Sequence, residues 1–124
     1  VNQVMSGEVR ALGRQLTEAR TLGIEPIRIV RSLQRRTALL AGLRSKVDGG
    51  ANAGALVRAT KSIFWKEQDE HARQLQRWTS TRLSGLMGHL LDMEKKLMAI
   101  GGDLGPVLLE EELARISRAA ARAK

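Results

Sequence analysis

The chain has no cysteine and no tyrosine, and its only aromatic hydrophobic side chains are one phenylalanine and two tryptophans among 124 residues. The absence of cysteine excludes disulfide bonds and thiolate metal sites and is compatible with a reducing cytoplasm. No apolar run reaches the roughly 18 residues that a membrane-spanning helix needs, so we expect no membrane partner. With so few rings, the core must be built from Leu, Ile, Val, Met and Ala, which suits helices packed on helices.

The charge of the chain is unevenly distributed. The net charge is +8, and residues 1–62 carry 11 basic but only four acidic side chains, against ten and nine in residues 63–124. A basic half can bind nucleic acid or an acidic protein. It can equally be an Arg-rich solvated surface, because helical surfaces commonly carry such charges.

Apolar periodicity of about 3.6 residues predicts an all-α fold, and no strand pattern occurs. Caps and breakers place the helix ends: Gly23 after the first helix, Pro26 in the first turn of the second, and Asn52 before a short one. We expect a compact bundle of five to six helices, at about 7–22, 26–47, 53–60, 64–79, 81–100 and 104–122. Residues 1–6 are expected to end a preceding segment or form a linker, and residues 7–124 to form one domain.

Residues 63–100 contain all three aromatic residues and are expected to organise the core. Helical spacing predicts that the following side chains are buried: Phe64, Leu75, Trp78, Leu83, Leu86 and Leu90. Trp65 is offset by about 100° from Phe64 on a helix, so it is a candidate for a subunit contact instead.

Two charged residues interrupt apolar stripes. Glu94 falls within the stripe of the helix at 81–100, and Arg36 within the stripe of the helix at 26–47. A buried charge needs a partner, so we predict that Arg36 and Glu94 pair, either within the domain or across an interface.

Four basic residues share the opposite side of the helix at 26–47 and are candidate interface or phosphate contacts. They lie within roughly 60° of one another at 100° per residue, and they are Arg28, Arg31, Arg35 and Lys46.

No catalytic constellation is recognisable in the sequence. His71 lies on an apolar face, His89 has no ligand partner at helical spacing, and neither belongs to a zinc motif. The glycine-containing segment 48–54 lacks the Lys-Ser/Thr of a phosphate-binding loop, and the carboxylates of residues 110–112 are expected to be solvated. We therefore expect no enzyme activity in this segment, no catalytic residue, no cofactor, no metal and no small-molecule substrate.

Short motifs are spread along the second half of the chain: Ile63-Phe64-Trp65-Lys66, Gln74-Leu75-x-x-Trp78, Leu83, and the acidic Glu94 in a Leu-rich helix. Together they resemble the C-terminal region of the bacterial DNA polymerase III delta subunit. Gly23-x-x-Pro26, followed by a helix and a Gly-containing break, is similar too, so the resemblance covers roughly residues 7–118. The chain departs from the family pattern at Ile63, where Phe is frequent, and at Met98, where Lys is frequent.

The resemblance implies that the chain is the helical collar domain of a clamp-loader subunit. In that family, collar domains join those of the gamma/tau and delta-prime subunits in a ring that holds the sliding-clamp loader together. This implies a non-catalytic oligomerisation domain that acts in DNA replication, in the cytoplasmic bacterial replisome. The parent subunit would belong to the DNA-directed DNA polymerase III holoenzyme, a nucleotidyltransferase.

An alternative is a basic helical domain that binds nucleic acid directly through phosphate contacts, using the four basic residues of the helix at 26–47. That helix offers no interleaved aromatic residues for stacking on bases. We therefore expect any DNA contact to be weak.

Overall fold

The computed structural model describes residues 2–7, 9–60, 63, 65–100 and 104–122, and every regular element in these ranges is helical. The predicted all-α bundle is confirmed. The elements are α1 (Asn2–Met5), α2 (Val9–Thr21), α3 (Pro26–Asp48), α4 (Ala53–Ala59), the 3₁₀ turn η1 (Trp65–Glu67), α5 (Gln68–Arg77), α6 (Ser80–Ile100) and α7 (Leu104–Arg122).

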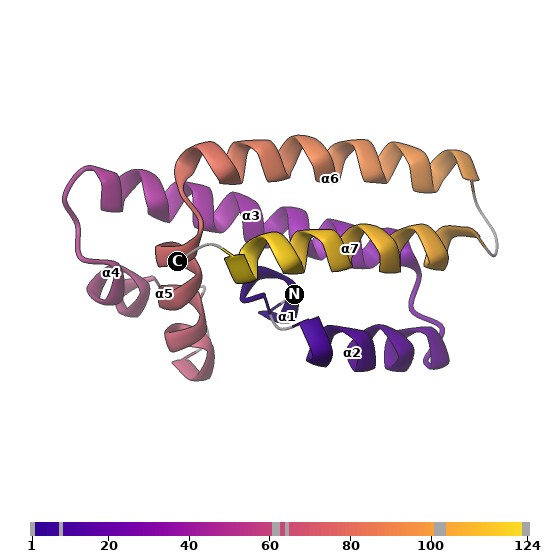
Figure 1. Cartoon of the computed structure of the whole chain (residues 1–124). Helices are drawn as coiled ribbons and strands as arrows, with labels where there is room; N and C mark the ends of the chain where they lie inside the picture. The colour runs from indigo at the N-terminus through magenta and orange to yellow at the C-terminus, as the bar shows by residue number, and fades with distance from the viewer. Residues whose placement is uncertain (1, 8, 61–62, 64, 101–103, 123–124) are drawn as a thin grey trace.

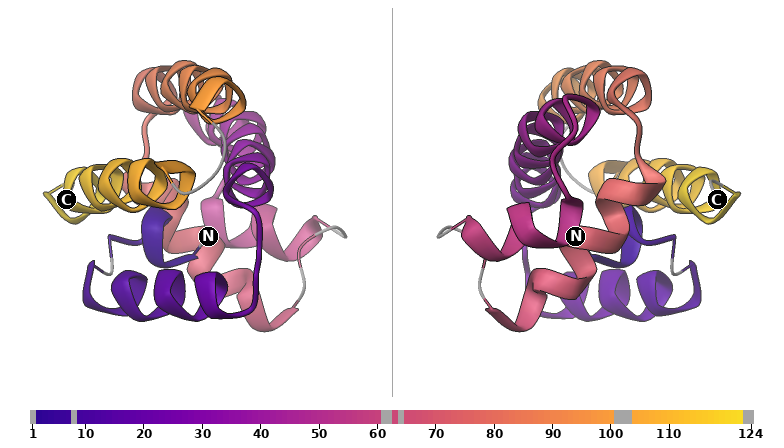
Figure 2. Two further views of the ribbon diagram at one scale, coloured as in Figure 1. Left: turned by 90° about the vertical axis from the view of Figure 1, so that its right-hand side faces the viewer. Right: turned by 90° about the vertical axis from the view of Figure 1, so that its left-hand side faces the viewer.

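Three long helices, α3, α6 and α7, run along the length of the molecule (Figure 1). The most extensive interhelical contact is between α3 and α6, and α7 packs mainly against α1 and α2. The shorter α4 and α5 pack on each other at one end, whereas the α2–α3 turn lies at the other end (Figures 1 and 2).

The helix ends follow local chemistry that is visible in the sequence. Gly23 has a φ of 73°, and the amides of Gly23 and Ile24 donate to the carbonyls of Arg20 (3.1 Å) and Ala19 (3.0 Å), which is a Schellman motif. The Asn52 side chain accepts a hydrogen bond from the Ala55 amide at 3.0 Å, so it caps α4 as predicted.

Two elements differ from the expectation. Residues 2–5, which were expected to end a preceding segment or form a linker, form α1, and Val4 and Met5 are buried in the bundle. The helix expected at 64–79 starts instead as the 3₁₀ turn η1 and becomes α5 at Gln68. Phe64 lies outside the described residues.

The other five residues predicted for the core are buried. Leu75, Leu83 and Leu90 are fully buried, Leu86 is nearly so, and Trp78 is 3% exposed. Trp78 also has a specific polar contact, because its Nε1–H donates to the Met5 carbonyl at 2.8 Å.

Trp78 lies in a tight corner where α1, α5, α6 and α7 meet, here called the Trp78 corner. The Arg82 guanidinium lies over its ring, with 4.8 Å between Cζ and the ring centroid. Arg82 and Arg77 donate to the carbonyls of Ala119 (3.1 Å) and Ala120 (3.0 Å), which satisfies acceptors in the last turn of α7.

Gly7 allows the segment that follows α1 to pass close to the backbone of α7 at the Trp78 corner. Its φ is 74°, and a Cβ there would lie 2.5 Å from the Ala121 backbone nitrogen. Since both the backbone conformation and the close approach exclude a side chain, the position requires glycine.

We expect Trp78→Ala to lower the free energy of unfolding by about 3–5 kcal/mol, the usual cost of truncating a buried aromatic residue. Trp78→Phe should cost less, because it keeps an apolar ring in the corner, although it loses the hydrogen bond to Met5 and leaves part of the indole volume unfilled. Leu91→Ala is the control, since Leu91 is 45% exposed. Urea unfolding measures all three, and a loss for Trp78→Ala no larger than for Leu91→Ala would contradict the prediction.

Candidate interaction surface

The four basic residues predicted to share one side of α3 differ in what they contact. Arg28, Arg35 and Lys46 are exposed, and Arg35 Nη2 donates to the Ser32 hydroxyl at 3.0 Å. Arg31 is instead 3.2 Å from the Glu94 carboxylate and is neutralised by it. Three cations of the predicted stripe, rather than four, therefore face solvent without an ion pair to another described residue.

The side chain of the remaining interface candidate, Trp65, lies outside the described part.

Glu94 does pair with an arginine, but within the chain the partner is Arg31, so the predicted Arg36–Glu94 pair within the domain is wrong. Because α3 and α6 are antiparallel, Arg31 lies opposite Glu94, and Gln34 donates to the Leu90 carbonyl one turn further along. Arg36 lies on another side of α3, where its Nη1 donates to Gln74 Oε1 at 2.9 Å. The pairing error has a simple cause, since helical spacing within α3 shows that Arg36 is inward-facing but not which neighbour it meets.

Arg36 belongs to a polar network that links α3, α5 and the start of the chain. Gln74 is fully buried, and its Nε2 donates to the Ser6 hydroxyl at 3.1 Å. Ser6 in turn donates to Glu70 Oε2 at 3.1 Å. Burial lowers the pKa of Arg36, and the nearby Glu67 and Glu70 carboxylates act in the opposite direction. The network therefore uses buried polar groups to fix the Met5–Gly7 segment on α5.

His71 is a structural residue of α5. It is 2% exposed, and its Nδ1 lies 2.8 Å from the Glu67 carbonyl, one turn earlier. Burial is the main cause that lowers the pKa of His71, and the neighbouring Arg36 lowers it further. A neutral imidazole that donates its Nδ1–H to the carbonyl fits these surroundings.

Sequence reasoning missed a contact between α6 and α7. Glu112, expected to be solvated, is only 8% exposed, and its Oε2 lies 2.9 Å from His89 Nε2. That oxygen makes no well-aligned hydrogen bond to the described residues, and Arg115 approaches the other carboxylate oxygen only to 3.9 Å. The helical spacing of Leu109, Leu113 and Ile116 places Glu112 on the same inner face of the helix, so the burial of Glu112 could have been predicted from the sequence.

The last turn of α6, the first turn of α7 and the end of α2 lie at the end of the molecule away from the C-terminal end of α7 (Figure 1), and these segments and the α2–α3 turn carry several exposed apolar side chains. We name this set the apolar end. It comprises Leu22 (69% exposed), Ile24 (39%), Met98 (70%), Ile100 (43%), Leu104 (64%) and Val107 (52%). Among the described residues, Leu91 is the one other large apolar side chain with comparable exposure. Scattered exposed hydrophobic residues are ordinary, whereas a concentration of them at one place marks an interaction surface.

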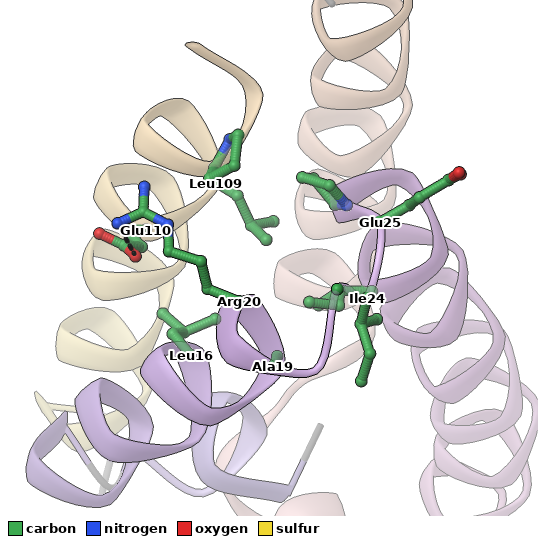
Figure 3. Close-up of a pocket in the computed structure, with 11 residues that line it drawn as sticks. Leu16, Ala19, Arg20, Ile24, Glu25, Leu109 and Glu110 are labelled. Atoms are coloured by element: carbon green, nitrogen blue, oxygen red, sulfur yellow. Dashed lines mark ion pairs between the residues drawn. The ribbon is translucent and has the colours of Figure 1, made fainter. Parts of the chain in front are cut away.

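An apolar pocket opens within the apolar end (Figure 3). It lies between the end of α2, the α2–α3 turn and the start of α7, and has a volume of about 240 Å³. Leu16, Ala19, Ile24 and Leu109 supply much of its lining. Arg20 and Glu110 form an ion pair across its edge at 3.7 Å, joining α2 to α7.

Two searches of the described part bear on ligands and membranes. No group of three or more His, Cys, Asp or Glu side chains there could hold a metal ion. None of its helices is both long enough and apolar enough to cross a membrane.

Comparisons with known proteins found no matching family model, no similar curated protein and no similar solved structure.

The corrected pairing on α3 can be tested by double-mutant cycles on the free energy of unfolding. We expect Arg31→Ala and Glu94→Ala to be coupled by about 0.2–1 kcal/mol, the usual range for a largely exposed ion pair. The matched cycle of Arg36→Ala with Glu94→Ala should be additive within about 0.5 kcal/mol. Coupling in the second cycle that exceeds the first would restore the original pairing.

The buried His71 predicts a pH dependence of stability. In the unfolded chain a histidine has its ordinary pKa of about 6.5, so the unfolded state binds this proton more readily than the folded state. The free energy of unfolding should therefore be highest above that pH and fall as the pH drops from about 7 to 5. We expect His71→Asn, which keeps a donor near the Glu67 carbonyl, to flatten this slope, whereas His89→Asn keeps the part due to His71. Equal slopes in His71→Asn and the unmodified chain would refute the assignment.

Proposed function

We propose that the chain is a non-catalytic protein-binding domain that joins subunits of a larger assembly. In its most specific form, the proposal is that it is the collar domain of a DNA polymerase III delta subunit. It would then bind the C-terminal domains of the gamma/tau and delta-prime subunits in the clamp loader during DNA replication.

The apolar end is the observation that carries the proposal. Six large apolar side chains face solvent in the α2–α3 turn, the last turn of α6 and the first turn of α7, and one of them, Ile24, also lines the pocket. Apolar surface that the fold leaves uncovered is a source of binding free energy for another protein, since its burial is favourable. The sequence motifs around Trp65 and Trp78 support the specific identity, and the helical fold agrees with it.

Direct binding of nucleic acid through phosphates is the second candidate function. It is favoured by the exposed cations Arg28, Arg35 and Lys46 on α3. The ion pair of Arg31 with Glu94 weakens this candidate, because it removes one cation from the middle of the stripe. Such binding would be weak and steeply dependent on salt.

Titration against both classes of partner separates the two functions. We expect the chain to bind the C-terminal domains of gamma/tau and delta-prime with an affinity that changes little between about 50 and 200 mM salt. Duplex DNA should bind only at micromolar concentrations or weaker, and the affinity should fall steeply over that range. The double variant Arg35→Gln/Lys46→Gln should weaken DNA binding and leave subunit binding unchanged. Tight DNA binding with no subunit association would reject the proposal in favour of the second candidate.

A further inference from the structure

The helix α2 is weakly docked compared with the other long helices. Of its side chains that the structure describes, at residues 12–21, Leu12 alone is buried, Leu16 and Ala19 are half-buried, and the rest are exposed. One ion pair, between the half-exposed Arg20 and Glu110 at 3.7 Å, joins these side chains to another described element. By contrast, α3 and α6 each bury five described side chains. Few buried contacts are typical of a segment that opens before the whole chain unfolds.

Cavities border α2 where it meets the bundle. Among the described residues, Leu16 lines three of them, with volumes of about 240, 300 and 140 Å³. The smallest lies between α2 and the core residues Leu33 and Leu113, and Leu16 lies across the 240 Å³ cavity from Leu109 (Figure 3). Side chains that line a void lose dispersion contacts on that side. The apolar face of α2 therefore gains little free energy from docking.

The two turns that flank α2 differ in how firmly they are held. Gly7 lies against the Ala121 backbone, and the nearby Met5 carbonyl accepts the Trp78 hydrogen bond. At the other end, no described residue lies within 4 Å of the position that a Cβ on Gly23 would take. Gly23 therefore has room to change conformation, whereas the turn at Gly7 stays fixed when α2 moves.

We propose that α2 is a lid that opens locally while α3, α5, α6 and α7 remain folded. Opening uncovers an apolar surface that includes Leu33, Leu109 and Leu113, and it joins the cavities to solvent. An undocked helix of 13 residues is only marginally stable in water, so α2 loses its helical hydrogen bonds when it opens. This motion goes beyond the proposed function and does not depend on it.

The absence of cysteine makes a single introduced thiol a specific probe of the opening. Leu12→Cys places the thiol on α2, and Leu90→Cys is the matched control on α6, since both leucines are buried. We expect Leu12→Cys to react with a thiol reagent at least about a hundredfold faster than Leu90→Cys without denaturant. Low urea should accelerate the control but hardly change Leu12→Cys, because local opening exposes less surface than global unfolding. Equal rates with equal urea dependence would overturn the proposal.

Amide hydrogen exchange tests the same opening in the unmodified chain and in a cavity-filling variant. Amides of residues 16–21 should exchange at least about a hundredfold faster than those of residues 86–97 in α6. Ala19→Leu adds apolar volume at two of the cavities and should slow exchange in α2 about tenfold. Glu18→Leu, at an exposed position of the same helix, should leave it nearly unchanged. Helix propensity cannot cause the slowing, since alanine is the better helix former. Equal effects of the two substitutions would refute the lid.

Leu16→Ala tests the lid in the opposite direction and adds no volume to the fold. It removes apolar contacts of α2 and should accelerate exchange in α2 about tenfold, although alanine favours the helix. The exchange of α6 amides should stay the same. An equal acceleration in α2 and α6 would mean that Leu16 supports the whole fold, and it would reject local opening.

Discussion

The hydrogen bond from the Trp78 indole to the Met5 carbonyl is the contact around which the bundle closes. It attaches α1 to the junction of α5 and α6, and the neighbouring Gly7 passes close to Ala121 in α7. Arg77 and Arg82, on either side of Trp78, satisfy carbonyls in the last turn of α7. Trp78 and its neighbours Arg77, Arg82 and Gly7 thus connect four helices, and Trp78 is the one aromatic residue in a described core that is otherwise aliphatic.

Several arginines are held in contacts within the fold, although these contacts leave the net charge of +8 unchanged. Arg31 pairs with Glu94, Arg44 with Asp48 at 2.9 Å, and Arg73 with Glu70 at 2.7 Å. Other arginines act as donors to backbone carbonyls, as Arg77 and Arg82 do. Such exposed pairs contribute little to stability individually, but they reduce the field available to attract phosphates. A net charge of +8 is therefore weak evidence for nucleic-acid binding in this chain.

Sequence reasoning predicted what depends on local chemistry and failed where the answer depends on a distant partner. Gly23, Pro26 and Asn52 set helix ends through backbone geometry and capping within a few residues, so these ends could be predicted. The partner of Arg36 is 38 residues away in sequence and depends on how α5 crosses α3, which periodicity does not encode. Hydrophobic periodicity could not predict the buried helix α1, because a helix of a single turn is too short to show a period. The apolar end was missed for a related reason: whether Leu22 or Val107 is covered depends on how distant helices pack, which the periodicity of one helix does not encode.

The two ends of the long helices are stabilised differently, and this asymmetry accounts for where apolar surface remains exposed. At the Trp78 corner, the first turn of α6 and the last turn of α7 are fixed by arginine donors and by a buried ring. At the other end, the last turn of α6 and the first turn of α7 present Met98, Ile100, Leu104 and Val107 to solvent. Covering these side chains requires surface that the described bundle does not supply. Because apolar burial is the dominant favourable term in association, covering this end would release more free energy than covering an equal area of the charged helix surfaces.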